Sequence, residues 1–440
     1  MRFFTMKLMT MKFFAIMKQT ILLFILSLSC LTISAQVVRE NVEKDLYITA
    51  GVHHPYNVPE KIADTKAPKG FKPFYVTHYG RHGSRLHTSE NIYSQNVPIL
   101  QTLAEKGLLT ETGLAVKAEM EWLQQQHDGM AGTLTVRGGM EQQGVAERLY
   151  KRCKGIFTQK GSKIVTSRAT NVHRVIQSMA YFNASLKACQ RDLQISMMTG
   201  NRYWDVLCFD TRKLENPNLK RQEEVRDSLH RVYVTALHPE QFFKDVKAVE
   251  EMTGLSAKEL EYKIFEAVHI THTMDNIEGH DPLALFSIDD LVSLGRIFNI
   301  VNCTWFMHSI ESGYVNELGV GRPILRDILQ TAEGAIAGNG HCADFRFGHD
   351  SGVGPLAGML EIGDYAKVFH LEESPDQWPA YRNICMCSNI QIILYRNNKS
   401  EVLVKVLFNE EEVAIGKACP AYSGPYYRWE DFRSFVQSKL

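Results

Sequence analysis

A strand-like run that ends in a basic, glycine-containing turn constrains this chain more than any other feature. Residues 71–79 read FKPFYVTHY, and aromatic and β-branched residues of this kind, followed by a glycine, are typical of a β-strand. The run leads directly into RHGSR at residues 81–85. Two guanidinium groups and an imidazole repel one another in so short a turn, so the grouping is favourable only where an anion lies among them. The sequence therefore predicts an anion site at the end of a strand.

The overall charge of the chain gives no reason to expect a large anionic partner. The 49 basic residues balance 49 acidic ones among 440 residues, so no global field attracts nucleic acid or an anionic membrane. With 45% hydrophobic residues, the composition is that of a globular protein with one large domain or two moderate ones. Any anion preference is expected to be local.

The first 35 residues have the pattern of a secretory signal peptide. Residues 1–18 carry basic but no acidic side chains, and residues 20–35 are uncharged, apolar and end in small residues. This run is shorter than the ~20 residues that a membrane-spanning helix needs. We expect cleavage near Ala35, no stable membrane insertion, and a mature protein in the periplasm or outside the cell. Met17 is an alternative start, and lipid attachment at Cys30 is an alternative that its upstream residues match poorly.

Alternating strand and helix patterns predict an α/β fold, with a central, mostly parallel sheet flanked by helices. Residues 37–70 are interpreted as a polar entry segment. Further strands are expected at 163–167 and 341–348, helices at 112–126, 138–153, 323–337 and 352–362, a helix around the apolar residues 172, 176, 179 and 182, and a closing β-hairpin at 389–397 and 401–409. Between 191 and 322 helical patterns dominate without a strong strand pattern. We therefore expect an α/β core at 36–190 and 323–440, with a helical subdomain inserted at 191–322 that caps the active site.

Two further groups of polar residues follow predicted strands. Arg174 lies in a helix after the strand at 163–167, and His349-Asp350 follow the strand at 341–348. Because ligands bind at the carboxyl ends of parallel strands, these groups and the RHGSR turn can converge on one pocket. Arginine matches phosphate oxygens with paired donors, a neutral imidazole can attack without a metal, and a carboxylic acid can protonate a departing alkoxide. Gly83 is expected to let the backbone approach the anion. For Asp350, a helix N-cap is the alternative.

The combination of motifs resembles the histidine acid phosphatase family, which is branch 2 of the histidine phosphatase superfamily and contains acid phosphatases, phytases and multiple inositol polyphosphate phosphatases. RHGSR at 81–85 and HD at 349–350 resemble its catalytic motifs. LTVRGGMEQQGVAERLY (134–150) is similar to its LT-x-x-G-x-x-Q helix, and SRATNVHRVIQS (167–178) to its R-S/T-T-x-x-x-R segment. FRFGHDSGVGPLAGML (345–360) is similar to its strand and helix around F-x-H-D. The resemblance covers most of the chain beyond residue 35 and is greatest to bacterial inositol polyphosphate phosphatases and phytases.

This resemblance implies a role for each candidate residue. It implies that His82 is a nucleophile that forms a phosphohistidine and that Asp350 protonates the leaving oxygen. Four side chains would bind the phosphoryl oxygens: Arg81, Arg85, Arg174 and His349. Neither a metal nor another cofactor is implied. Inositol polyphosphate phosphatases usually carry His-Ala-Glu at the proton-donor position, whereas His349-Asp350 is the form of phytases and acid phosphatases.

Several other residues of the same types are expected to be structural. The second GHD, at 279–281, precedes a proline and follows no strand, so we interpret it as a turn. His78 is expected to pack inside the predicted strand. Tyr79 and His87 flank the basic turn and are also expected to pack, with substrate contact as the alternative. For Arg168, support of the pocket and a surface ion pair are equal alternatives.

Two pairs of neighbouring histidines are candidate metal ligands. His53 and His54 are adjacent, and His269 and His272 lie in HITHT. Neither pair has the carboxylate or cysteine companions of a metal site, so metal binding is not expected. The eight cysteines beyond residue 35 leave disulfides and buried thiols as equal alternatives.

The implied function is a secreted phosphomonoesterase that acts on a small molecule, with inositol polyphosphates as the favoured substrates. One alternative is an acid phosphatase of broad specificity for sugar phosphates and other small phosphomonoesters, or a phosphate-transferring mutase relative. Export argues against a mutase, whose phosphorylated metabolites lie in the cytoplasm. Another alternative is a secreted binding protein of the same fold without activity, which the presence of His82, Arg85 and Asp350 disfavours.

Overall fold

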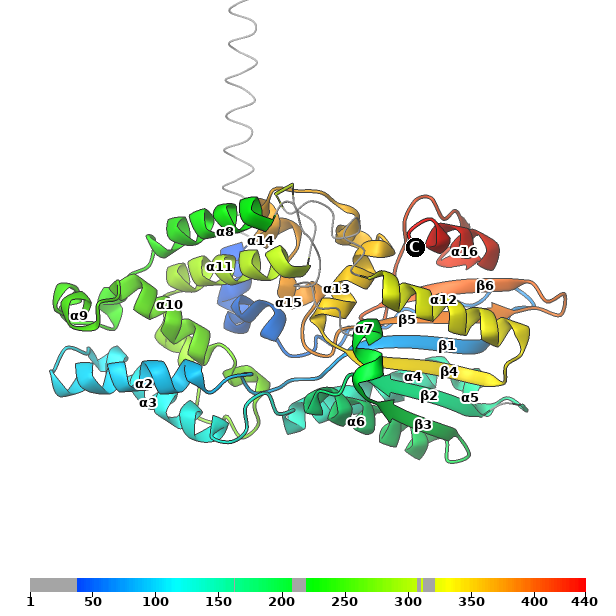
Figure 1. Ribbon diagram of the computed structural model, residues 1–440, viewed down its shortest axis with the longest axis horizontal. Coiled ribbons are helices and arrows are strands. Elements are labelled where there is room, and N and C mark those ends of the chain that lie inside the picture. Colours follow the sequence, from blue (N-terminus) through cyan, green and yellow to red (C-terminus); the bar gives the residue numbers. More distant parts are fainter. Residues whose placement is uncertain (1–37, 162, 208–218, 307–309, 312–320) are drawn as a thin grey trace, which may run out of the picture.

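A mixed sheet flanked by helices forms one half of the molecule, and a group of helices forms the other (Figure 1). The computed structural model describes residues 38–161, 163–207, 219–306, 310–311 and 321–440, so the expected signal peptide lies outside the described residues. The nine strands of the sheet are β1 Lys72–Arg81, β2 Ile164–Ala169, β3 Gln194–Thr199, β4 His341–Gly348, β5 Asn389–Arg396, β6 Val402–Phe408, β7 Glu411–Glu412, β8 Ala421–Ser423 and β9 Tyr426–Arg428. The expected α/β fold class is confirmed.

The helices divide between the two halves. Those around the sheet include α4 Val136–Arg152, α5 Lys154–Thr158, α6 His173–Cys189, α7 Trp204–Leu207, α12 Arg322–Ala337, α13 Asp350–Met359 and α16 Trp429–Gln437. Those of the helical half are α2 Asn91–Glu105, α3 Glu111–His127, α8 Leu219–Val234, α9 Val246–Thr253, α10 Ala257–Val268 and α11 Ile288–Phe306. Three short helices lie where the halves meet: the 3-10 helix η1 Leu46–His53, α14 Ser374–Gln377 and α15 Ala380–Asn383.

Four neighbouring parallel strands set the position of the candidate site. The order in the sheet is β3-β2-β4-β1-β5-β6-β9-β8, and β3, β2, β4 and β1 run parallel. The last residue of β1, Arg81, pairs with the last residue of β4, Gly348. The polar segments that follow these two strands therefore leave the sheet side by side. Beyond β1 the sheet is antiparallel, and β5 and β6 form the expected hairpin.

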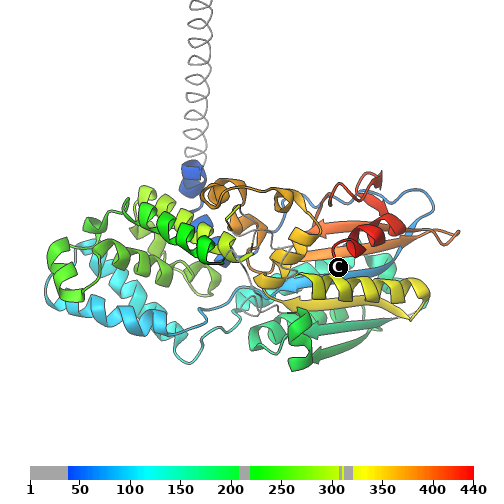
Figure 2. The same ribbon diagram turned by 45° about the horizontal axis from the view of Figure 1, so that its top comes forward.

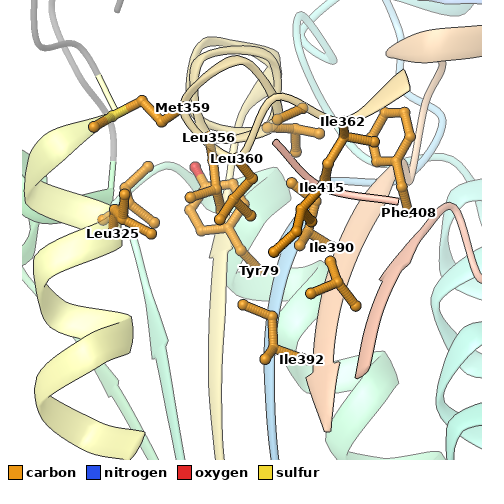
Figure 3. Close-up of a cluster of buried hydrophobic side chains, with 14 of the residues drawn as sticks. Tyr79, Leu325, Leu356, Met359, Leu360, Ile362, Ile390, Ile392, Phe408 and Ile415 are labelled. Carbon is orange, nitrogen blue, oxygen red and sulfur yellow. The ribbon is translucent and has the colours of Figure 1, made fainter. Parts of the chain in front are cut away.

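Side chains of β1 point alternately into two hydrophobic cores. Tyr79 packs with α12 and α13 on one face, where Leu325, Leu356 and Leu360 lie near its ring (Figure 3). Val76 packs on the other face, with α4, α5 and α6. The strand is buried on both faces, which fixes its position and that of the turn that follows it.

The helical half has a hydrophobic core of its own. Side chains from α2, α3, α9, α10 and α11 form one buried cluster. Seen from a second direction, these helices still lie together beside the sheet (Figure 2). The sequence predicts residues 91–127 as part of the α/β core, but α2 and α3 bury their apolar faces in the cluster of the helical half. The helices between residues 191 and 322 therefore pack against α2 and α3, which come earlier in the chain, and no sequence pattern indicates this packing.

Two other expectations are wrong in detail. Residues 191–322 include a strand, β3, which pairs in parallel with β2 at the edge of the sheet. Its side chains are mostly exposed, so it lacks the hydrophobic pattern of a buried strand. Residues 37–70 are not only an entry segment, because η1 buries Tyr47, Ala50 and Val52 and packs against α11. Short apolar runs of this kind carry no clear periodicity.

No helix within the described ranges is long and apolar enough to cross a membrane. All seven cysteines that lie in the described ranges are free thiols, and six of them are buried. Cys208 lies outside the described residues.

Candidate active site

The RHGSR turn is held by backbone hydrogen bonds at the end of the parallel strands. The His82 N–H donates to the carbonyl oxygen of Gly348 at 3.1 Å, and the Cys387 N–H donates to the His82 carbonyl at 2.9 Å. The Arg81 N–H donates to the Ser388 carbonyl at 2.9 Å. The turn is therefore fixed on one side by β4 and on the other by the residues that lead into β5.

Helix α4 supports the turn from a third side. Gln142 Nε2 donates to the Arg81 carbonyl at 2.8 Å, and the N–H and hydroxyl of Ser84 each donate to the Glu141 carboxylate at 2.8 Å. A Cβ atom on Gly83 would overlap the backbone of Gly138 at the start of α4. The sequence predicts that Gly83 lets the backbone approach an anion, and the structure gives a different reason for a glycine here, which is the close approach of α4.

His82 is buried and has a defined tautomer. The residue is 2% exposed, and its Nδ1 is 2.9 Å from the Gly83 carbonyl oxygen. A carbonyl only accepts, so Nδ1 carries the proton and Nε2 has a free lone pair. Burial, and then the charges of Arg174 and Arg81, hold the pKa of the His82 imidazole well below its usual 6.5. The imidazole is therefore neutral and available as a nucleophile or hydrogen-bond acceptor.

Arg81 joins the turn to Asp350. Its guanidinium is fully buried, and Nη1 donates to the carbonyl oxygens of Val52 and Ile384, at 2.6 Å each. Its Nη2 forms an ion pair with Asp350 Oδ2 at 2.8 Å. Burial alone would raise the pKa of the Asp350 carboxyl, but Arg81, His349 and Arg85 hold it below its usual 3.8.

Asp350 is the first residue of α13, and the preceding His349 occupies the N-cap position without a capping side-chain bond. The N-cap alternative for Asp350 is therefore wrong. One carboxylate oxygen accepts from the Ser351 N–H at 2.8 Å, and the other faces Arg81. This position leaves the carboxyl beside the guanidinium, at the turn that follows β4.

His349 faces His82 across the site. The two ring centroids are 5.6 Å apart with the planes at 77°, and His349 Nε2 lies 3.2 Å from the Thr170 hydroxyl. Burial and the charge of Arg174 lower the pKa of His349 to about 3. Tyr79 fixes the backbone here, since its hydroxyl accepts from the His349 N–H at 3.3 Å and donates to the Leu207 carbonyl at 2.6 Å. This agrees with the expected packing role of Tyr79.

The remaining predicted arginines belong to the same electrostatic cluster. Arg85 is 7% exposed, and burial followed by the charges of Arg174 and Arg81 lowers its pKa to about 9. The charge of Arg174 also depresses the pKa values of His82 and His349. The structure thus brings all six predicted site residues together. Their three arginines surround the neutral imidazole of His82 and outnumber the single carboxylate, Asp350.

The second GHD lies in the helical half and has structural contacts. The His280 ring stacks on Trp122 with centroids 3.7 Å apart, and its Nδ1 is 2.9 Å from a Glu119 oxygen. Asp281 accepts a hydrogen bond from the Tyr47 hydroxyl at 3.0 Å. These contacts agree with its interpretation as a turn.

His78 and Arg168 are likewise structural. His78 packs on Phe182, with ring centroids 5.0 Å apart, and is 1% exposed. Arg168 makes two hydrogen bonds to the Asp327 carboxylate, at 2.8 and 2.7 Å. Of its two alternatives, the ion pair is therefore the one observed, although both partners are largely buried.

The sequence does not predict that His53 contacts Arg85 and His269. His53 Nε2 lies 2.9 Å from Arg85 Nη2, and His53 Nδ1 lies 2.7 Å from His269 Nε2. No local pattern indicates these contacts, because His53 and Arg85 are 32 residues apart and His53 and His269 are 216 apart. Within the described ranges, no group of three or more His, Cys, Asp or Glu side chains could hold a metal ion.

Comparisons with known proteins agree with the resemblance seen in the motifs. The model of the histidine phosphatase superfamily (branch 2) matches residues 79–409. A search of curated proteins gives no match. Among solved structures, the multiple inositol polyphosphate phosphatase of Bifidobacterium longum in complex with inositol hexasulfate is 18% identical, with a TM-score of 0.71 over 89% of this chain and 97% of that chain.

Two phytases have similar folds. The phytase from D. castellii is 13% identical, with a TM-score of 0.60 over 89% of this chain and 85% of its own. The Hafnia alvei phytase is 13% identical, with a TM-score of 0.52 over 85% of this chain and 98% of its own. At these identities the likeness establishes the fold.

Proposed function

We propose a function for this chain from the premise that it belongs to branch 2 of the histidine phosphatase superfamily. Membership makes it a phosphatase. The finer proposal is a secreted phosphomonoesterase that hydrolyses inositol polyphosphates through a phosphohistidine intermediate. One observation carries it: the Nδ1–H of His82 is committed to the Gly83 carbonyl, which leaves the Nε2 lone pair among buried cations.

In the first half of the reaction, His82 Nε2 attacks the phosphorus of the bound ester. The guanidinium groups of Arg81, Arg85 and Arg174 stabilise the charge on the phosphoryl oxygens, with His349 as a further donor. A phosphorus–nitrogen bond forms as the bond from phosphorus to the ester oxygen breaks. Asp350 takes up a proton from solvent when the bound dianion weakens its ion pair with Arg81, and it gives this proton to the ester oxygen, so the product leaves as an alcohol.

In the second half, water replaces the histidine. The Asp350 carboxylate accepts a proton from the water as its oxygen attacks phosphorus, and the phosphorus–nitrogen bond breaks. Inorganic phosphate leaves, and both His82 and Asp350 return to their initial protonation states. His82 and Asp350 act from positions at the ends of β1 and β4, so little reorganisation is needed.

The preference for inositol polyphosphates rests on similarity. The Bifidobacterium longum enzyme of the same fold binds inositol hexasulfate, in which sulfate groups stand in for phosphates. Two further proteins of this fold are phytases. We also propose that residues 1–35 are a signal peptide and that the mature enzyme acts outside the cytoplasm. Mass spectrometry of the native protein's N-terminus tests this, because an intact first residue on envelope or medium protein would contradict it.

Phosphate release tests the proposed activity. The purified enzyme is expected to release phosphate from inositol hexakisphosphate with a higher kcat/KM than from glucose 6-phosphate, and His82→Ala is expected to release none from either. A higher kcat/KM for the sugar phosphate would favour a broad acid phosphatase. Retained activity in His82→Ala would contradict the nucleophile.

A further inference from the structure

Two histidines from distant parts of the chain, the partly buried His53 and the buried His269, connect Arg85 to the helical half. Arg85 Nη2 lies 2.9 Å from His53 Nε2, in η1, and His53 Nδ1 lies 2.7 Å from His269 Nε2, just after α10. His269 Nδ1 is 3.1 Å from the Phe265 carbonyl oxygen. The four groups form a continuous hydrogen-bonded chain from the basic turn into the helical half.

The direction of every bond in this chain is fixed by the carbonyl at its end. The Phe265 carbonyl only accepts, so His269 carries its proton on Nδ1 and accepts at Nε2. His53 therefore donates from Nδ1, and its Nε2 accepts the Arg85 N–H. Each donor meets one acceptor only if both imidazoles are neutral. Burial, and then the charge of Arg85, hold the pKa of His53 well below 6.5, and burial lowers that of His269 to about 4.

The surroundings keep the two rings in place. His53 packs against Phe298, whose ring centroid is 5.5 Å from that of His53 and 4.7 Å from that of His269. The His87 ring stands nearly perpendicular to both, at 6.0 and 5.4 Å. In such apolar surroundings a satisfied hydrogen bond is strong and an unsatisfied donor is costly.

A neutral acceptor has a consequence that a carboxylate would not have. Arg81 is paired with Asp350, so part of its charge is already neutralised. Within the described ranges, the side chain of Arg85 donates to the Leu86 carbonyl and to His53 and to no carboxylate. An imidazole orients the guanidinium without cancelling its charge, which stays available to an incoming anion.

We propose that His53 and His269 are positioning residues, which together orient Arg85 for the phosphoryl group without themselves neutralising its charge. The inference rests on the proposed function, in which Arg85 binds phosphate. Phosphate affinity then depends on a hydrogen-bond acceptor for Arg85 at position 53. It also depends on an acceptor at position 269, which receives the hydrogen bond from His53.

The test is competitive inhibition by inorganic phosphate, measured in a double-mutant cycle. His53→Leu, which removes the acceptor, is expected to weaken inhibition about tenfold, the size typical of a hydrogen bond to a charged group. His53→Gln keeps a neutral acceptor and is expected to restore most of the affinity. In an Arg85→Ala background, His53→Leu is expected to add nothing, because its effect passes through Arg85.

A second pair of variants covers the case in which His53→Leu does not fold. His269→Leu leaves His53 in place but removes its acceptor, so that the His53 proton can move to Nε2 and oppose Arg85. It is expected to weaken phosphate inhibition more than His269→Gln does. His127→Leu is the matched control for His269→Leu, since both histidines are buried. Among the described residues, the His127 ring bonds to the Leu123 carbonyl and the His87 N–H, with the Tyr93 hydroxyl at 3.5 Å, and not to Arg85 or His53. His127→Leu is expected to lower the melting temperature and to leave phosphate inhibition unchanged.

The outcomes separate this inference from the proposed function. Unchanged phosphate inhibition in Arg85→Ala would contradict the phosphate-binding role of Arg85 itself. Two outcomes with weakened inhibition in Arg85→Ala would overturn only the positioning role of His53 and His269. In the first, neither His53→Leu nor His269→Leu changes phosphate inhibition. In the second, His53→Leu weakens inhibition by the same factor with and without Arg85.

Discussion

Arg81 Nη2 lies 2.8 Å from Asp350 Oδ2, in an ion pair between the last residue of β1 and the first residue of α13. The guanidinium is fully buried, whereas 22% of the aspartate side chain is exposed. In the proposed reaction, the first residue binds the anion and the second supplies the proton. Their contact couples the two events, because an anion that shares Arg81 weakens its hold on the carboxylate.

This coupling predicts proton uptake when an anion binds. Without an anion, Arg81 and its neighbours keep the pKa of Asp350 below 3.8, so the carboxyl is ionised at about pH 5. A bound dianion raises that pKa, and a raised pKa means that the complex holds more protons than the free enzyme. Calorimetry of sulfate binding in buffers of different ionisation enthalpy is expected to show this uptake, since sulfate itself does not titrate there. The uptake is expected to be smaller in Asp350→Asn, and equal uptake in both proteins would contradict the coupling.

The role of Asp350 as a proton donor predicts a dependence on the leaving group. An inositol or sugar alkoxide is strongly basic and needs a proton as it leaves, whereas nitrophenolate does not. Asp350→Asn is expected to slow phosphorylation of the enzyme by alkyl phosphates by ~10²–10⁴-fold, and by nitrophenyl phosphate much less. Single-turnover kinetics measures this step without interference from dephosphorylation.

Asp281→Asn is the control for this comparison, because it changes the other GHD aspartate, which bonds to Tyr47. It is expected to leave turnover within a few-fold. A loss as large as that of Asp350→Asn would contradict the location of the site, and equal small effects of Asp350→Asn on both substrates would leave the site without its proton donor.

The contact between Gly83 and Gly138 predicts a stability effect. Gly83→Ala would drive a methyl group into the backbone at the start of α4, and such overpacking typically costs ~1–3 kcal/mol of unfolding free energy. Gly155→Ala is the matched control, because a Cβ there meets only Pro73, at 3.7 Å, and lies within helix α5. Chemical denaturation is expected to show a loss for the first variant and none for the second. Equal stabilities would contradict the close approach.

The elements that carry the site could be predicted because each leaves a local signal. β1 and β4 are buried along most of their length. Aromatic residues recur in both strands, and the residues that follow each strand are polar. The rule that ligands bind at the carboxyl ends of parallel strands then brings His82 and Asp350 together. The fold class follows from the same alternation of strand and helix patterns.

Other features depend on contacts that leave no local signal. β3 lies at the edge of the sheet with exposed side chains, so only its pairing with β2 makes it a strand. α2 carries Pro98 in its interior, which argues against a helix from sequence alone. The bond between His53 and Arg85 exists only because η1 packs against α11 and is thereby held beside the turn.

The central claim is that His82 carries the phosphoryl group during turnover. Rapid quenching of the enzyme with a phosphorus-labelled substrate, followed by peptide mapping under basic conditions, tests it most directly. The account predicts an acid-labile, base-stable phosphoryl group on His82, formed within one turnover and absent from His82→Ala. A phosphoryl group on a serine or on another histidine, or turnover in His82→Ala, would contradict it.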